Sequence, residues 1–145
     1  MYASIVVGTD GSPTAEAALD KALELATLSG ARVHVVSAYE PARARVTGGA
    51  PAGEAYGSSV GSGYKADVAL QRALDRFGAS GIEVEQHAPK GSPADALIAV
   101  AKENDADVIV IGSVGMQGAR RVLGSVPNKV SHASPCDLLI VQTAG

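Results

Sequence analysis

The sequence predicts one α/β domain over residues 1–145, with an open five-stranded parallel sheet covered by helices on both faces. Three observations support this fold class. The chain has 145 residues, the length of a single domain with a full core. Short β-branched runs alternate with segments of helical periodicity, as in right-handed β-α-β crossovers. Hydrophobic residues make up 46% of the chain but aromatic residues only 3%, so we expect a core of small aliphatic side chains.

The first part of the chain supplies two strands and one helix. Buried strands are expected over residues 4–8 and 31–39. Between them, Ser12 can cap a helix and Pro13 suits its first turn. Alanines and leucines then recur at helical spacing as far as Gly30, where the helix should end.

The composition changes after the second strand. Residues 40–63 consist mostly of Gly, Ala, Pro and Ser with scattered Arg and show no sustained period, so we expect a flexible loop. Within it, residues 57–61 match the Gly-x-Ser-x-Gly motif of α/β hydrolases. That motif requires a preceding strand, which residues 50–53 do not provide, and we therefore reject a hydrolase function.

The second half continues the alternation of helices and strands. The expected elements are a helix over residues 66–77, an edge strand over 82–87, a helix capped by Ser92, a buried strand over 107–112, a short helix over 127–133 and a strand over 137–142. If the last strand lies at a sheet edge, its unpaired backbone groups and apolar side chains must be shielded from solvent or from pairing with other chains. This favours a homodimer joined through residues 137–142.

The stretch after the fourth strand carries the main functional prediction. Gly112 and Gly115 follow an apolar run, and Gly124-Ser125 precedes a helix. Because they lack Cβ atoms, Gly112 and Gly115 can take positive φ and allow a phosphate to approach the backbone. Ser125 lies where a helix N-terminus offers unpaired N–H groups. The pattern indicates a phosphate site at the carboxyl end of the strand, and the alternative is a tight strand-to-helix turn.

Three charged residues are candidates to complete this site. Asp10 follows the first strand and should lie at the same sheet edge, where it could accept from a ribose hydroxyl or a base amine, or hold a metal-bound water. The alternative for Asp10 is an Asx turn. Arg120 and Arg121 could contact a phosphate through bidentate hydrogen bonds, or could be ordinary surface charges.

Composition argues against several classes of partner and site. A net charge of -3, a pI near 5.5 and few aromatic residues argue against nucleic acid. The sequence shows neither a membrane-spanning apolar run nor a basic signal-peptide region. The single cysteine, Cys136, fits a reducing cytoplasm. His34, His87 and His132 fall on different expected elements without a second ligand at metal spacing, so no metal site is expected.

Two motifs in combination resemble the universal stress protein family, and the resemblance extends over essentially the whole chain. Residues 7–12, Val-Gly-Thr-Asp-Gly-Ser, match the Asp-containing turn after the first strand of that family. Gly112-x2-Gly115-x8-Gly124-Ser125, followed by Val126, matches its Gly-x2-Gly-x9-Gly-[Ser/Thr] phosphate motif. The resemblance implies a Rossmann-like sheet with strand order 3-2-1-4-5, numbered along the chain.

The resemblance also implies an adenine-nucleotide site. By position, Gly8, Thr9, Asp10 and Ala38 would line the adenine and ribose. The residues that would surround the phosphates are Gly112, Ser113, Gly115, Met116, Gln117, Gly118, Gly124, Ser125 and Val126. The implied ligand is ATP with Mg²⁺, or AMP or cyclic AMP. The spacer before Gly124 is one residue shorter than the family pattern, and in a helical turn the loss of one residue rotates the rest of the chain by about 100°.

The implied function is regulation or sensing in stress responses, by a cytoplasmic homodimer without a dedicated catalytic activity. Two alternatives remain open. One is a dimeric interaction module that has lost nucleotide binding. The other is a slow ATPase that uses Asp10 and a metal-bound water.

Overall fold

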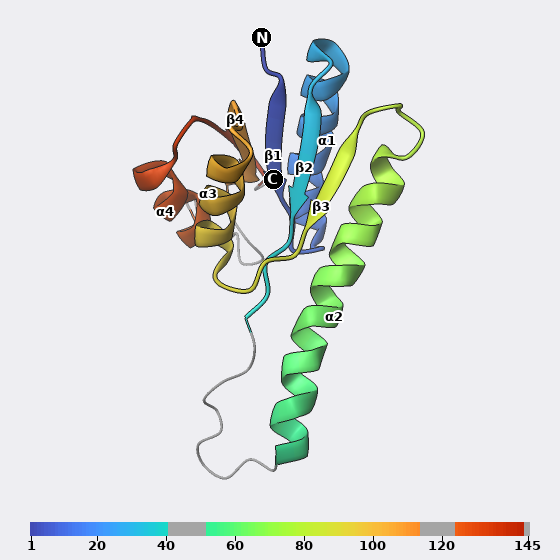
Figure 1. The fold of residues 1–145 in the computed structure, drawn as a ribbon, viewed down its shortest axis with the longest axis vertical. Coiled ribbons are helices and arrows are strands. Elements are labelled where there is room, and N and C mark those ends of the chain that lie inside the picture. Colours follow the sequence, from blue (N-terminus) through green and yellow to red (C-terminus); the bar gives the residue numbers. More distant parts are fainter. Residues whose placement is uncertain (41–51, 114–123, 144–145) are drawn as a thin grey trace.

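The computed structural model describes residues 1–40, 52–113 and 124–143, with only the backbone described for residues 52–62. All five strands are parallel, in the order β3-β2-β1-β4-β5, which confirms the predicted topology (Figure 1). The elements are β1 Ser4–Gly8, α1 Pro13–Ser29, β2 Arg32–Val36, α2 Ala52–Phe77, β3 Val84–His87, α3 Pro93–Glu103, β4 Val108–Gly112, α4 Ser125–Ala133 and β5 Asp137–Val141.

Helices cover both faces of the sheet, as predicted, because successive side chains of each strand point to opposite sides. Ile5 and Val7 of β1 pack into one core cluster with residues of α1 and α2. Val6 packs into a second cluster with residues of α3 and α4. The central strands β1 and β4 are therefore buried on both faces, and the sheet is the middle of three layers.

Local capping sets where the helices begin and end. The side chain of Ser12 accepts a hydrogen bond from the Ala15 N–H, and Pro13 follows at the first position of α1. Gly30 ends the helix in the left-handed conformation, at φ 77°. Helix α3 repeats the N-terminal pattern with Ser92 and Pro93. These short signals explain why both helices could be predicted from sequence alone.

The expected loop over residues 40–63 is wrong from Ala52 onward, because α2 begins there and runs to Phe77. Residues 52–63 contain four glycines, each of which disfavours a helix. This part of α2 could therefore not be predicted from sequence. In Figure 1 the first turns of α2 extend beyond the sheet. The rest of the expected loop, residues 41–51, lies outside the described residues.

The two edges of the sheet differ. β3 is a short edge strand, as predicted, and its consecutive residues Glu85 and Gln86, which point to opposite faces of the sheet, are both exposed. β5 forms the other edge, and Leu138 to Val141 are only partly buried in the single chain. None of the helices in the described ranges has the length and apolarity needed to cross a bilayer.

Candidate functional site: a cleft at the carboxyl edge of the sheet

A cleft opens where β1, β2 and β4 end. Its walls are the ends of these strands and the first residues of α1, α3 and α4. The lining residues are Gly8, Thr9, Asp10, Ser12, Thr14, Ala15, Val36, Ala38, Pro93, Leu97, Ile111, Gly112, Ser125, Val126 and Pro127. Seven of the predicted site residues are therefore brought together here: Gly8, Thr9, Asp10, Ala38, Gly112, Ser125 and Val126. This edge is where parallel α/β sheets bind ligands.

The two strand-end glycines allow close packing around the cleft. A Cβ on Gly8 would lie 3.1 Å from Leu97 Cδ2 of α3, and a Cβ on Gly112 would lie 3.0 Å from Thr143 Cγ2. Gly112 is not among the described glycines with positive φ, so the expectation of a left-handed backbone there is wrong. A side chain at 112 would instead require Thr143 to shift by a few tenths of an ångström.

Three helices begin at the cleft, and they differ in how their first N–H groups are satisfied. Serine side chains cap α1 and α3. The cap of α4 is Gly124, which has no side chain to offer. The carbonyl of Gly124 accepts from the Asn128 N–H, while Ser125 and Val126 contribute N–H groups at the helix start. The N-terminus of α4 is therefore suited to receive an anion.

The turn after β1 places Asp10 at the mouth of the cleft. Asp10 Oδ1 accepts a hydrogen bond of 2.9 Å from the Ser12 N–H, which is the Asx turn considered as an alternative. The buried Thr9 accepts from the Gly11 N–H through Oγ1, and Gly11 takes φ 82°. This turn fixes the position of the Asp10 carboxyl group, which is exposed and lines the cleft.

Ser113 and Gly124 support the cleft without lining it. The Gly124 N–H donates 2.9 Å to the Ser113 carbonyl, which joins the end of β4 to the start of α4. The Ser113 hydroxyl donates to Gln142 Oε1 at 3.0 Å, and the Thr143 N–H donates to the Ser113 hydroxyl at 3.1 Å. The structure therefore gives Ser113 a role in fastening β4 to the end of β5.

Several lining residues were not predicted. Val36 and Ile111 are core residues of β2 and β4 whose side chains face α3, and Leu97 belongs to the inner face of α3. Hydrophobic periodicity could identify them as core residues but could not show that they reach the cleft. Thr14 could have been predicted from sequence, because it is a polar residue two positions after Ser12, the predicted cap. In the structure the two hydroxyl groups lie 3.0 Å apart.

Other predicted residues cannot be placed. Gly115, Met116, Gln117, Gly118, Arg120 and Arg121 all lie outside the described residues.

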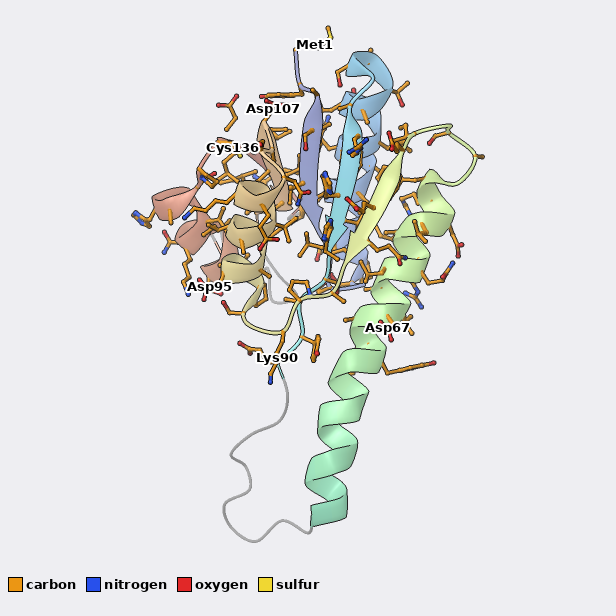
Figure 2. All side chains as sticks on the ribbon, in the orientation of Figure 1. Met1, Asp67, Lys90, Asp95, Asp107 and Cys136 are labelled. Atoms are coloured by element: carbon orange, nitrogen blue, oxygen red, sulfur yellow. The ribbon has the colours of Figure 1, made fainter. Side chains whose placement is uncertain are left out.

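Cys136 lies near Asp107 at the opposite, amino edge of the sheet, while Lys90 and Asp95 lie toward the carboxyl edge (Figure 2). Burial raises the pKa of the Cys136 thiol, which favours a structural role over a reactive one.

Two of the three histidines, which belong to different strands, lie close to each other and to a carboxylate. Pairing of β2 with β3 places His34 opposite Glu85, and His87 follows two residues later on the same face. The donor atoms of His34, Glu85 and His87 all lie within 4.8 Å of one another. Sequence spacing could not show this, because the two histidines belong to different strands.

Comparison with known proteins gives a consistent result. The model of the universal stress protein family matches residues 1–142. A universal stress protein of Mycobacterium tuberculosis (strain H37Rv) is 38% identical over 157 residues, covering 98% of this chain and 97% of its own. A universal stress protein crystallised in complex with cAMP has a TM-score of 0.72 at 35% identity, covering 98% of each chain. The universal stress protein from Archaeoglobus fulgidus in complex with dAMP has a TM-score of 0.64 at 27% identity, covering 96% of this chain and 97% of its own.

Proposed function

This chain belongs to the universal stress protein family, and from that premise we propose that it binds an adenine nucleotide in the cleft and acts as a regulator or sensor in stress responses. The binding residues would be those predicted from sequence. Gly8, Thr9, Asp10 and Ala38 would contact the nucleoside. The backbone at Gly112 and the start of α4 would contact the phosphates.

The observation that carries the proposal is the N-terminus of α4, where glycine replaces a capping side chain next to the end of β4. Helix α4 has nine residues, enough to develop a positive end. A phosphate there would accept hydrogen bonds from backbone N–H groups, and hydrogen bonds to a charged group contribute about 1.5–3 kcal/mol each. The N–H groups of Ser125 and Val126 could supply two such bonds, about 3–6 kcal/mol in all, since Pro127 has no N–H and the Gly124 N–H is bound to Ser113. Contacts of the base and ribose with the cleft would have to supply the rest of the net free energy of about 8 kcal/mol that micromolar affinity requires.

ATP with Mg²⁺ is the proposed ligand. Mg²⁺ prefers oxygen ligands and is usually held by one or two carboxylates together with phosphates and water. Asp10 is the only carboxylate among the described residues that line the cleft, and its fixed position fits that role. Bound Mg²⁺ would neutralise phosphate charge, and Asp10 would hold the ion or one of its waters at the mouth of the cleft.

Cyclic AMP or AMP is the second candidate. Its support is that a universal stress protein 35% identical to this chain was crystallised with cAMP, and a second relative with dAMP. Both ligands carry one phosphate, which the start of α4 alone could receive. Calorimetric titrations with ATP and Mg²⁺, AMP and cAMP will rank the three, and tightest binding of cAMP would overturn the preference for ATP.

Two alternatives differ in class. An interaction module without a nucleotide would show no affinity for any of these ligands. A slow ATPase would release phosphate at a rate that falls in Asp10→Ala while ATP still binds. We propose neither, because the start of α4 lines the cleft without a capping side chain and the described residues that line the cleft include no evident strong general base besides Asp10.

The proposal includes a cytoplasmic homodimer joined through residues 137–142. The half-buried side chains of β5 and its position at the sheet edge support the interface. The single cysteine supports a reducing compartment.

The proposed site is tested by adding a charge to it. Ser125→Asp places a carboxylate at the start of α4, where repulsion of a phosphate should weaken nucleotide binding at least about tenfold. Ser131→Asp is the matched control, since Ser131 is an exposed residue near the other end of the same helix. Equal affinities of the wild type and Ser125→Asp by calorimetry would place the phosphate elsewhere.

A further inference from the structure

A cluster of two imidazoles and one carboxylate lies at the β3 edge of the sheet and consists of His34, Glu85 and His87. His34 Nδ1 lies 3.0 Å from His87 Nε2 and 3.2 Å from Glu85 Oε1. His87 Nε2 lies 3.8 Å from the same Glu85 oxygen. Three potential ligand atoms of two chemical types, from two neighbouring strands, therefore lie within 3.8 Å of one another.

The triangle formed by these atoms has the size of one face of a zinc coordination sphere. In a tetrahedral site with bonds of about 2.0–2.1 Å, ligand atoms are about 3.3 Å apart. The three separations here, 3.0, 3.2 and 3.8 Å, bracket that value. A point equidistant from the three atoms lies about 2.0 Å from each of them, which is the length of a bond from zinc to a His nitrogen or a carboxylate oxygen.

The two imidazole rings approach each other through one nitrogen each. The rings are tilted by 44° with centroids 5.1 Å apart, so they are not stacked. Each presents one nitrogen to the other at hydrogen-bonding distance. In the metal-free protein one proton between the nitrogens satisfies this contact, and a cation would replace that proton.

The surroundings of the cluster suit a metal site with one open position. His34 is buried, with 2% of its side chain exposed, whereas His87 is 22% and Glu85 56% exposed. Burial, and next the neighbouring His87, lower the pKa of His34. The exposed side at Glu85 leaves room for water as a fourth ligand.

We propose that His34, Glu85 and His87 form a binding site for a divalent transition-metal ion of the zinc type. Two imidazoles and one carboxylate suit Zn²⁺ and its neighbours Co²⁺, Ni²⁺ and Cu²⁺, and do not suit Mg²⁺ or Ca²⁺, which prefer oxygen ligands. The site is therefore chemically distinct from the Mg²⁺ position proposed at Asp10. One of its residues, His87, is the sheet partner of Val36, which lines the cleft, whereas His34 lines a separate pocket with Ser4 and Arg32.

The test uses the full chain without a polyhistidine tag, treated with EDTA and titrated with Zn²⁺ in excess Mg²⁺. We expect calorimetry to show one Zn²⁺ bound per chain. When Co²⁺ replaces Zn²⁺, we expect the visible absorption bands of Co²⁺ in four- or five-coordinate, non-octahedral geometry. His87→Ala and Glu85→Ala should each weaken Zn²⁺ binding by at least about 100-fold, since loss of an outer-sphere partner alone costs about 10- to 100-fold. Both positions are exposed enough to tolerate truncation, and circular dichroism will verify the fold.

Matched controls separate this site from adventitious binding. His132→Ala removes an exposed histidine of α4, and Glu83→Ala removes the carboxylate two residues before Glu85; both should leave Zn²⁺ affinity unchanged. Zn²⁺ should also raise the melting temperature of the wild type and of these controls but not of His87→Ala. Absence of Zn²⁺ binding, or binding abolished by Cys136→Ser and retained in His87→Ala, would overturn the proposal and leave the cluster as a hydrogen-bonded structural feature.

Discussion

Gly112 and Thr143 lie so close together that a Cβ on Gly112 would be 3.0 Å from Thr143 Cγ2. Gly112→Ala should therefore lower the free energy of unfolding by about 1–3 kcal/mol, the usual cost of overpacking. Thr143→Ser removes Cγ2 and keeps the hydroxyl, so Gly112→Ala should cost less in that background. Urea denaturation of the four proteins of this double-mutant cycle will measure the coupling. Additive effects would show that Thr143 is not what requires glycine at 112.

The two roles of Asp10 can be separated. Asp10→Asn keeps an oxygen that can accept from the Ser12 N–H but removes the negative charge. We expect the fold to be unchanged and the dependence of ATP affinity on Mg²⁺ to be lost. Asp10→Ala removes the Asx turn as well and should reduce stability by about 1 kcal/mol. Calorimetry with and without Mg²⁺ is the measurement, and an unchanged Mg²⁺ dependence in Asp10→Asn would move the ion away from this residue.

Asp107 ties the start of β1 to the start of β4. Its Oδ2 accepts hydrogen bonds of 2.8 and 2.9 Å from the N–H groups of Ala3 and Ser4, near Met1 at the amino edge (Figure 2). These two bonds lower the pKa of Asp107. A lowered pKa in the folded state means that the stabilisation is complete above the unfolded pKa of about 4 and is lost as the pH falls through the folded value.

Asp107→Asn should consequently reduce stability by about 0.5–1 kcal/mol at neutral pH, since solvent screens a carboxylate so close to the surface. The difference from the wild type should shrink as the pH is lowered from 5 toward 3, because the protonated wild-type carboxyl loses the same advantage. Chemical denaturation across this pH range will measure the difference. Asp137 is the matched control, since it is an exposed aspartate at the same edge that accepts from Tyr2 instead. A constant difference across the range would contradict the assignment.

The dimer can be tested at the two edges of the sheet. Leu139 of β5 and Val84 of β3 are both partly buried against the same core cluster, and both lie on edge strands. The wild type should have a mass in solution of twice 14.5 kDa by light scattering. Leu139→Lys should yield a monomer, whereas Val84→Lys should be destabilised to a similar degree but remain dimeric. A monomeric wild type would contradict the interface.

The parts of the structure that could be predicted from sequence depend on local signals. Serine followed by proline predicted the starts of α1 and α3, and β-branched runs predicted β1 and β4. What could not be predicted depends on how distant elements meet. The convergence of His34 on His87 depends on the register of β2 against β3, and the proximity of Gly112 to Thr143 depends on where the chain continues after β5.

The helices that begin at the cleft belong to opposite layers: α1 packs on one face of the sheet, α3 and α4 on the other. A molecule bound among their first turns would contact the helices of both outer layers and the strand ends between them. Neither α1 nor α4 could then detach from the sheet without first losing that molecule, and so ligand release and local opening on either side would become the same event.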